Sequence, residues 1–341
     1  MTWAWTTSPA LPTWCPSPGS RPRMPRSSNR DARKDTRPVA RPGAARVRDF
    51  HGVYVPVPTP FRGDQVATDR LKANLAKWNA TDLAGYVVLG STGEFPMLSE
   101  AERDAVLVAA REAIPRGKAF LAGTGANSTL HTIRQTKRAA EIGADAAIVI
   151  TPHYFTKGFA QAGAQVRHYV AVAEASPIPV MLYNFPLNTG INLEPDTVAR
   201  IAEHPNVCGI KDSSGNIPQA AHIIHLTPKT FHVLVGSAAA LLPALPIGAS
   251  GGVLALGAIA GRELCEVYGF ARDGRWEEAK AIAARMMLAD RGVAGRFGIG
   301  GLKAALDLQG FYGGPCRAPL GTPDGDAIED IKECLASAGL L

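Results

Sequence analysis

Short apolar runs alternate with amphipathic stretches along most of this chain, and this alternation constrains the fold more than any other feature. Eight such runs occur between His51 and residue 270, with stretches of helical periodicity between them. Eight β/α units predict an α/β fold, a (β/α)8 barrel. A doubly wound sheet is the alternative, but no GxGxxG turn follows the first run. The expected strands are Gly52–Pro58, Gly85–Leu89, Ala119–Ala122, Ala146–Ile150, Val180–Tyr183, Val207–Ile210, His232–Val235 and Gly251–Leu254.

Residues at the ends of the expected helices support this pattern. Ser99 and Glu102 form a capping-box pattern, Pro195 suits a first helical turn, and Gly143 suits a helix end. A barrel at 49–270 should be followed by a helical region at 271–341. The Gly- and Pro-rich segments 297–303 and 312–319 are expected to pack under the barrel as helix ends. The expected helices are Thr68–Thr81, Ser99–Ile114, Thr129–Ile142, Ala160–Ala175, Glu194–His204, Arg275–Asp290, Gly300–Leu308 and Asp326–Ala338.

Residues 1–48 differ in composition from the rest of the chain. They contain ten Arg or Lys and two Asp among many Pro and Ser, so this segment carries a charge of +8 and the rest of the chain, with a total of +6, carries −2. We predict a disordered basic tail. Acid-poor, Arg-rich composition also occurs in organelle transit peptides, although the prolines oppose an amphipathic helix. We expect a cytoplasmic protein, or a mitochondrial one if the tail is a targeting segment.

Composition also argues against several classes of protein. Apolar stretches are interrupted well before the ~20 residues that a membrane span needs. No basic face with aromatic support follows residue 49, so we expect neither a membrane nor nucleic acid as a partner. The five widely spaced cysteines form no CxxC pattern, which predicts free thiols in a reducing compartment and no zinc site.

The chemistry of a (β/α)8 barrel lies at the carboxyl ends of its strands, and one lysine stands at such an end. Lys211 follows the apolar run Val207–Ile210. A desolvated lysine supplies the neutral amine that attacks a carbonyl carbon to form a Schiff base. A lysine whose ammonium simply reaches solvent is the ordinary alternative. The other strand ends carry hydroxyl and amide groups and no metal-ligand set: Thr59, Ser91, Thr92, Thr124, Thr151, Tyr154, Tyr183, Asn184 and Ser237.

Two of these strand ends suggest partners for the lysine. Tyr183 ends the strand before that of Lys211, so both groups can reach one substrate atom, and a phenol can move protons. A core tyrosine is the alternative. The turn Gly90–Glu94 offers hydroxyls and backbone N–H groups to a carboxylate, or is an ordinary loop. Gly251 and Gly252 allow close approach of a ligand or of packed backbone.

Four segments in this order resemble the dihydrodipicolinate synthase and N-acetylneuraminate lyase superfamily of pyruvate-handling class I aldolases. They are Gly90–Glu94, Thr151–Tyr154, Tyr183–Pro186 and Gly209–Asp212. The resemblance covers His51 to Leu320 and implies a barrel enzyme that needs no metal and no cofactor. Within the superfamily the chain most resembles 4-hydroxy-2-oxoglutarate aldolase, through Gly93–Pro96, Leu121–Gly123, Asn188–Gly190, Arg296–Ile299 and Tyr312–Leu320.

The resemblance also implies roles for individual residues. Lys211 forms the Schiff base with the 2-oxo carbon of the substrate, and Tyr183 shuttles protons for imine formation and carbon–carbon cleavage. Ser91 relays protons between Tyr183 and Tyr154, which reaches in from a neighbouring subunit. Cleavage gives pyruvate and glyoxylate, and the assembly is a homotetramer, a dimer of dimers. The implied substrate-binding residues are Thr92, Ser213, Asn188, Gly236 and Leu254.

Two departures from the family pattern bear on the substrate. The synthase branch carries an arginine in the stretch that reads Leu187–Gly190 here, which disfavours aspartate semialdehyde as a substrate. The 4-hydroxy-2-oxoglutarate aldolases often carry Asn in place of Thr92 and Ser in place of Asn184, and we expect both positions to adjoin the substrate. The alternatives are therefore a 4-hydroxy-tetrahydrodipicolinate synthase or a 2-keto-3-deoxy sugar acid aldolase.

Overall fold

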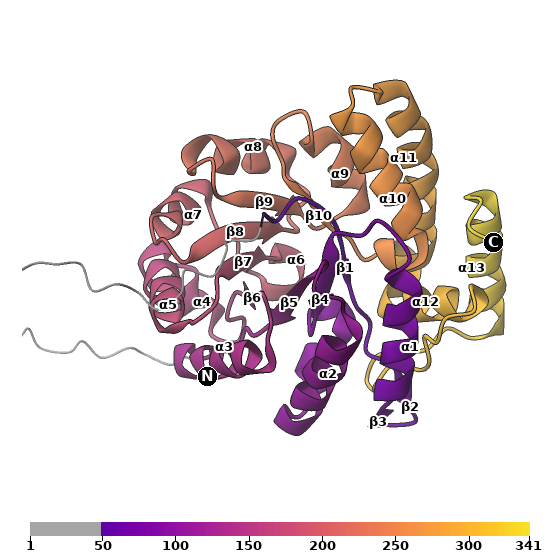
Figure 1. Cartoon of the computed structure of the whole chain (residues 1–341), viewed down its shortest axis with the longest axis horizontal. Helices are drawn as coiled ribbons and strands as arrows, with labels where there is room; N and C mark the ends of the chain where they lie inside the picture. The colour runs from indigo at the N-terminus through magenta and orange to yellow at the C-terminus, as the bar shows by residue number, and fades with distance from the viewer. Residues whose placement is uncertain (1–48) are drawn as a thin grey trace, which may run out of the picture. The chain divides into compact units, whose positions relative to one another are not determined.

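The computed structural model describes residues 49–341, which contain a closed barrel of eight parallel strands (Figure 1). The strands follow chain order around the barrel, and β1 closes on β10. The predicted barrel is confirmed, and the predicted tail lies outside the described residues. The strands are β1 Gly52–Pro56, β4 Gly85–Val88, β5 Ala119–Gly123, β6 Ala146–Ile150, β7 Val180–Asn184, β8 Val207–Asp212, β9 His232–Val235 and β10 Gly251–Val253.

Helices surround the barrel and bury their apolar faces against its strands. The barrel helices are α1 Thr68–Trp78, α2 Glu100–Ala113, α3 Thr129–Ile142, α5 Ala162–Ala175, α7 Pro195–Ala202, α8 Ile217–Leu226, α9 Ala238–Ala244 and α10 Gly257–Arg272. Among the described residues, no helix is both long and apolar enough to cross a membrane. Shorter elements are the hairpin β2 Phe61–Arg62 and β3 Gln65–Val66, the turns η1 Ser91–Gly93 and η2 Phe95–Met97, and the helices α4 Thr156–Phe159 and α6 Pro186–Thr189.

The predicted helix signals act as expected. Ser99 and Glu102 form a complete capping box at the start of α2, which satisfies two backbone N–H groups that would otherwise lack partners. Gly143 ends α3 in the left-handed region with φ 99°, which a side chain would disfavour. Pro195 occupies the first turn of α7.

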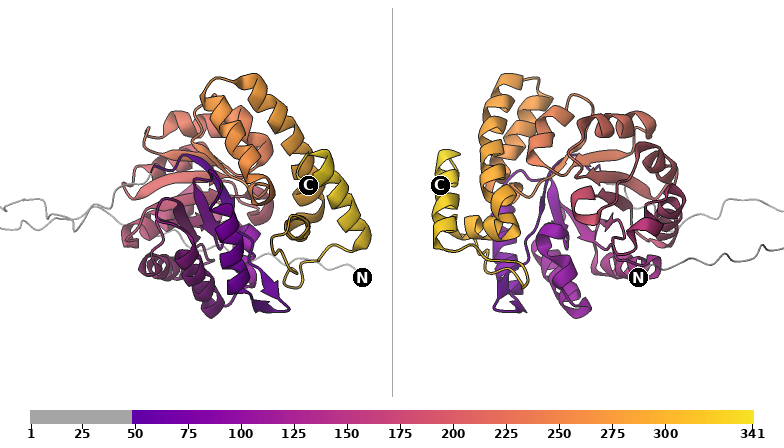
Figure 2. Two further views of the ribbon diagram at one scale, coloured as in Figure 1. Left: turned by 45° about the vertical axis from the view of Figure 1, so that its right-hand side comes forward. Right: turned by 180° about the vertical axis from the view of Figure 1, so that it is seen from behind.

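The C-terminal region continues from the barrel as α11 Trp276–Asp290, η3 Arg291–Gly295, α12 Arg296–Leu308 and α13 Gly325–Ser337. Helix α13 packs on α12 and α11 (Figure 2). Helix α12 begins earlier than predicted and is broken at Gly298, whose φ of 61° and ψ of −146° require glycine. The break separates the first turn of α12, at Arg296 and Phe297, from the regular helix that follows.

Closure of the barrel depends on a close approach between its first and last strands. Gly52 lies opposite Gly251, and the Gly52 N–H donates a 2.9 Å hydrogen bond to the Ser250 carbonyl. A Cβ on Gly251 would lie 1.9 Å from the Gly52 carbonyl oxygen, and Gly251 has φ +145°. The predicted close approach at Gly251 is therefore made by packed backbone at this seam.

Candidate active site

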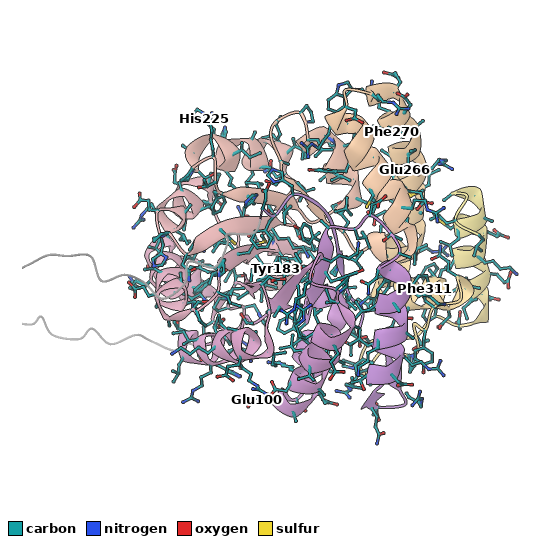
Figure 3. All side chains as sticks on the ribbon, in the orientation of Figure 1. Glu100, Tyr183, His225, Glu266, Phe270 and Phe311 are labelled. Atoms are coloured by element: carbon teal, nitrogen blue, oxygen red, sulfur yellow. The ribbon has the colours of Figure 1, made fainter. Side chains whose placement is uncertain are left out.

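A lysine and a tyrosine face each other on adjacent strands of the barrel. The parallel register of β7 and β8 places Tyr183 directly beside Lys211. Lys211 is only 5% exposed, and its Nζ lies 4.1 Å from the centre of the Tyr183 ring. Figure 3 shows Tyr183 among the strands of the barrel, away from its outer helices. A third strand end joins them, because Ser91 Oγ lies 3.3 Å from the Tyr183 hydroxyl.

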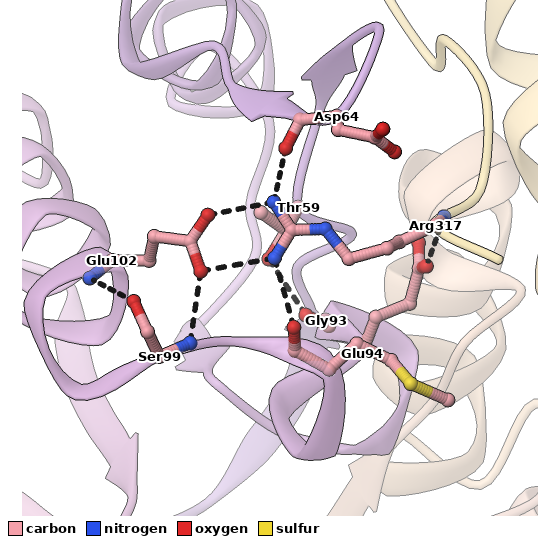
Figure 4. Close-up of polar contacts among 8 residues, drawn as sticks. Thr59, Asp64, Gly93, Glu94, Ser99, Glu102 and Arg317 are labelled. Atoms are coloured by element: carbon pink, nitrogen blue, oxygen red, sulfur yellow. Dashed lines mark hydrogen bonds and ion pairs between the residues drawn. The ribbon is translucent and has the colours of Figure 1, made fainter.

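The loop that carries Ser91 is held in a defined shape by its surroundings. Residues Ser91–Gly93 form a 3-10 turn, and Glu94 follows in the left-handed region with φ 53° and ψ 33°. The Thr59 hydroxyl donates a 2.7 Å hydrogen bond to the Gly93 carbonyl (Figure 4). Thr59, one of the predicted strand-end hydroxyls, therefore positions this loop.

A pocket of about 210 Å³ lies beside this loop. Ser91 and Asn188 both line it, so the structure brings together a predicted catalytic residue and a predicted substrate-binding residue. Three further lining residues, His153, Ile299 and Leu320, belong to segments that carry the family resemblance but were not predicted as site residues. Ile299 follows the break at Gly298 and Leu320 belongs to the segment after α12, so the C-terminal region forms part of the pocket wall.

Glu94 connects the loop to the C-terminal region through a buried ion pair. Its Oε1 lies 2.5 Å from Lys303 Nζ, and both side chains are almost wholly buried. Lys303 also donates a 2.9 Å hydrogen bond to the Pro315 carbonyl, and the Arg317 N–H donates a 2.9 Å hydrogen bond to Glu94 Oε2. Burial lowers the pKa of Lys303, and the adjacent Glu94 carboxylate opposes that effect.

Arg317 extends the connection to helix α2. Its guanidinium donates hydrogen bonds of 2.9 and 2.6 Å to the two carboxylate oxygens of Glu102 and one of 2.8 Å to the Met97 carbonyl (Figure 4). The bond from Arg317 lowers the pKa of Glu102 from 4.5 to about 2. This contact is therefore fully present at neutral pH and is lost as the pH falls from about 4.5 towards 2. The expectation that residues 312–319 pack under the barrel is wrong, because they hold the loop after β4.

Comparison with known proteins identifies the family. The sequence profile of the dihydrodipicolinate synthetase family matches residues 49–338. The chain belongs to this family. A 4-hydroxy-tetrahydrodipicolinate synthase from Methanospirillum hungatei JF-1 is 35% identical over 291 residues, which cover 84% of this chain and 99% of that protein.

Solved structures of dihydrodipicolinate synthetase family proteins agree with this assignment. The 4-hydroxy-tetrahydrodipicolinate synthase of Methylacidiphilum fumariolicum SolV superposes with a TM-score of 0.81 at 28% identity, covering 85% of this chain and 96% of its own. YagE from E. coli K12, solved in complex with pyruvate, gives a TM-score of 0.81 at 28% identity over 86% and 99% of the two chains. The protein is thus a class I aldolase-type lyase that reacts through a Schiff base. The two synthases carry the name of the predicted alternative, not that of 4-hydroxy-2-oxoglutarate aldolase.

One position at which the chain departs from the aldolases of this family does not adjoin the substrate as expected. Asn184 is fully buried, and its amide donates hydrogen bonds of 2.8 Å to Asn192 and 2.9 Å to Asp212. Side chains alternate along a strand, so Asn184 points away from the side of the sheet that Tyr183 occupies. The prediction for Asn184 is wrong for this reason, and its amide helps to hold the ends of β7 and β8 together.

The pocket beside Ser91 does not include all of the residues predicted from the sequence. Thr92, Ser213, Gly236 and Leu254 do not line the pocket around Ser91 and Asn188. Gly236 approaches Ser213 so closely that a Cβ on it would lie 1.8 Å from the Ser213 hydroxyl oxygen, and Leu254 is fully buried. Tyr154 is 75% exposed and packs its ring edge-to-face on Phe155, with ring centres 4.9 Å apart. Among the described residues of this chain, Tyr154 therefore has no contact with Tyr183 or Ser91.

The buried ion pair yields a stability prediction. Replacing Lys303 by Met leaves the Glu94 carboxylate buried without its cation, and we expect a loss of about 3–5 kcal/mol in the free energy of unfolding. The double variant Glu94→Gln/Lys303→Met removes both charges and should recover most of that loss. Urea denaturation followed by circular dichroism measures both. Equal stability of Lys303→Met and the wild type would contradict the prediction.

Proposed function

We propose that this protein cleaves 4-hydroxy-2-oxoglutarate to pyruvate and glyoxylate through a Schiff base on Lys211. The proposal rests on the arrangement of Lys211, Tyr183 and Ser91. The amine and the phenol lie on neighbouring strands, and the hydroxyl reaches the phenol from the loop after β4, across the mouth of the barrel. The substrate assignment rests on the resemblance at Arg296–Ile299 and Tyr312–Leu320. Ile299 and Leu320 from these segments line the pocket beside Ser91. The residues that resemble the aldolase are therefore among those that would contact the substrate.

The proposed reaction uses the three side chains in turn. The Lys211 amine attacks the 2-oxo carbon, and loss of water gives a protonated imine that draws electrons from the adjacent bonds. Tyr183 removes the proton of the 4-hydroxyl, the C3–C4 bond breaks, and glyoxylate leaves. The resulting enamine is protonated at C3, and hydrolysis of the imine releases pyruvate and restores the amine. Ser91 passes protons to and from Tyr183, and Ser91 and Thr92 hold the carboxylate next to the imine.

We place the distal carboxylate of the substrate in the pocket that Asn188 and His153 line. Both side chains offer hydrogen-bond donors. Among the described residues no Arg or Lys lines this pocket, and the Glu94 carboxylate that also lines it is paired with Lys303. Its volume of about 210 Å³ suits a two-carbon aldehyde acid such as glyoxylate. Ile299 and Leu320 close the pocket with apolar surface, which disfavours a long polar chain such as that of a sugar acid.

A second candidate is condensation of pyruvate with aspartate semialdehyde. The names of the compared relatives favour it, because the Methanospirillum hungatei JF-1 protein, 35% identical, is a 4-hydroxy-tetrahydrodipicolinate synthase. Both reactions pass through the enamine of pyruvate on the lysine, which forms after bond cleavage in the first candidate and before bond formation in the second. The two candidates differ in the direction of the reaction and in the aldehyde, and Asn188 stands where the synthase branch carries its arginine.

The lysine assignment predicts a specific covalent product. Borohydride should trap pyruvate on Lys211, seen by mass spectrometry as one modified peptide, and Lys211→Ala should give no adduct. Tyr183→Phe should keep the fold but lower kcat by about 10²–10⁴-fold, because it removes the proton shuttle. An adduct on another lysine would overturn the assignment of Lys211.

The aldehyde assignment predicts a difference between two assays. Purified enzyme should release glyoxylate from 4-hydroxy-2-oxoglutarate with a larger kcat/KM than it shows for pyruvate with aspartate semialdehyde. Asn188→Ala should raise KM for 4-hydroxy-2-oxoglutarate by about 10–100-fold, the value of a hydrogen bond to a charged group. The same variant should leave borohydride trapping of pyruvate unchanged. Preference for aspartate semialdehyde would support the synthase instead.

We also propose that Tyr154 completes the site of a neighbouring subunit in a homotetramer. Three large apolar or aromatic side chains near the strand ends are strongly exposed: Tyr154 at 75%, Phe155 at 76% and Leu187 at 87%. A group of exposed apolar side chains of this kind is typical of a surface that another chain covers. The His153 and Tyr154 N–H groups donate hydrogen bonds to Asn127 Oδ1, at 3.0 and 3.2 Å, so the segment is held in its exposed position.

This assembly predicts complementation between inactive subunits. Lys211→Ala lacks the nucleophile, and Tyr154→Phe lacks the hydroxyl that serves the neighbouring site. Co-refolded mixtures should regain activity, because a mixed pair of subunits holds one site with both groups intact. A mixture with no more activity than its two components would contradict the role of Tyr154 in the neighbouring site, and size-exclusion chromatography with light scattering would show whether mixed oligomers formed.

A further inference from the structure

Two imidazoles and one carboxylate meet at the end of the barrel opposite Lys211. His232 is the first residue of β9, and His51 and Asp49 precede β1, so all three lie at the amino ends of strands. One ligand atom from each lies within 4.8 Å of the others. We propose that Asp49, His51 and His232 bind a divalent transition-metal ion of the zinc class.

His232 is the fixed member of this group. It is only 7% exposed, and the Phe50 ring packs edge-to-face against it with centres 5.7 Å apart. Its Nδ1 lies 3.4 Å from the Ser250 hydroxyl and can form a hydrogen bond with it. The other ring nitrogen, Nε2, faces Asp49. Metal-binding histidines commonly have their second nitrogen held by such a partner, because the partner fixes the tautomer and the ring orientation.

Asp49 and His51 are the adjustable members. They flank Phe50, which is fully buried and anchors this segment to the barrel. Their own side chains are 74% and 47% exposed, and His51 Nδ1 forms a hydrogen bond with Asp49 Oδ1. The His51 and His232 rings stand at 90° with centres 5.1 Å apart. Both adjustable side chains therefore face the fixed imidazole.

The separations suit a tetrahedral site after small side-chain rotations. Zinc bonds of about 2.0–2.1 Å place neighbouring ligand atoms about 3.3 Å apart. The Asp49 Oδ1 to His232 Nε2 distance is 3.7 Å, close to this separation. His51 Nδ1 is now hydrogen-bonded to Asp49 Oδ1, so one of these two exposed side chains has to rotate away from the other to make room for the ion. Two nitrogens and one oxygen favour Zn²⁺, Co²⁺ or Ni²⁺ over Mg²⁺ and Ca²⁺, which prefer oxygen ligands.

The group is open to solvent, so an ion can reach it. A surface hollow of about 600 Å³ is lined by Asp49 and His51, and a second of about 630 Å³ is lined by His51 and Asp82. A water molecule can complete the coordination from this side. A bound ion would link the segment before β1 to the start of β9, across the seam where β10 closes the barrel.

The test uses the full chain after removal of metal with a chelator. Zn²⁺ is titrated in competition with a chromophoric chelator, and Co²⁺ is added separately for its ligand-field absorption. We expect one site per chain, a tetrahedral Co²⁺ spectrum without sulfur charge-transfer bands, and a higher melting temperature with Zn²⁺. His51→Ala and Asp49→Asn should each weaken Zn²⁺ binding by at least ~10-fold.

Matched controls keep the test decisive. His225→Ala removes an exposed histidine on α8 that is not a member of the group, and this variant should bind Zn²⁺ like the wild type. His232→Gln should abolish binding; if it does not fold, the two exposed variants decide. Unchanged affinity in His51→Ala and Asp49→Asn, or a sulfur-ligated Co²⁺ spectrum, would overturn the proposal. Borohydride trapping of pyruvate should be unaffected in all four variants, so failure here is distinct from failure of the proposed reaction.

Discussion

The register between β7 and β8 is the constraint on which the catalytic end of this barrel depends. It sets Tyr183 beside Lys211 and, one residue later, Asn184 beside Asp212. The outer pair is held by the 2.9 Å hydrogen bond between them and by the Ser214 hydroxyl, which donates a 2.8 Å hydrogen bond to Asp212. A slip of one residue would turn the outer pair inward and the reactive pair outward. The outer hydrogen bonds therefore fix the register that the inner chemistry needs.

The C-terminal region acts on the same end through charge. Glu94 and Lys303 are both buried, and a buried ion pair generally contributes little net stability against an apolar pair of equal volume. The Glu94–Lys303 pair instead disfavours other conformations, because any arrangement that separates the two side chains leaves an unpaired charge buried. Our hypothesis is that this pair selects one position of the loop after β4, and with it the position of Ser91. The stability of the single and double variants at these positions bears directly on it.

Much of this arrangement follows from the sequence. Eight apolar runs predict eight strands, and neighbouring strands in a parallel barrel bring Lys211 close to Tyr183. The alternation of side chains along a strand could also have predicted that Asn184 points away from the side on which Tyr183 lies. Long-range pairing could not be predicted in this way. Glu94 and Arg317 are 223 positions apart, and the resemblance of their segments to the family does not indicate that the two residues contact each other. Only Lys303 could have been recognised as a candidate for a buried ion pair, because it is a lone cation within the apolar stretch Gly300–Leu306. The sequence analysis judged zinc binding from the spacing of the cysteines. It therefore did not consider Asp49, His51 and His232, which are distant in sequence and come together only when the barrel closes.

The two ends of the barrel thus differ in what holds them. At the carboxyl ends, a buried ion pair and a bidentate arginine fix the loop beside the reactive groups. At the amino ends, glycine backbones meet so closely at the seam that no side chain crosses it, and histidines and an aspartate gather beside it. Residues at the amino face of such barrels generally serve stability. A metal ion there would strengthen closure of the barrel. It would not alter the reactivity of the imine on Lys211, because the metal site and Lys211 lie at opposite ends of the strands.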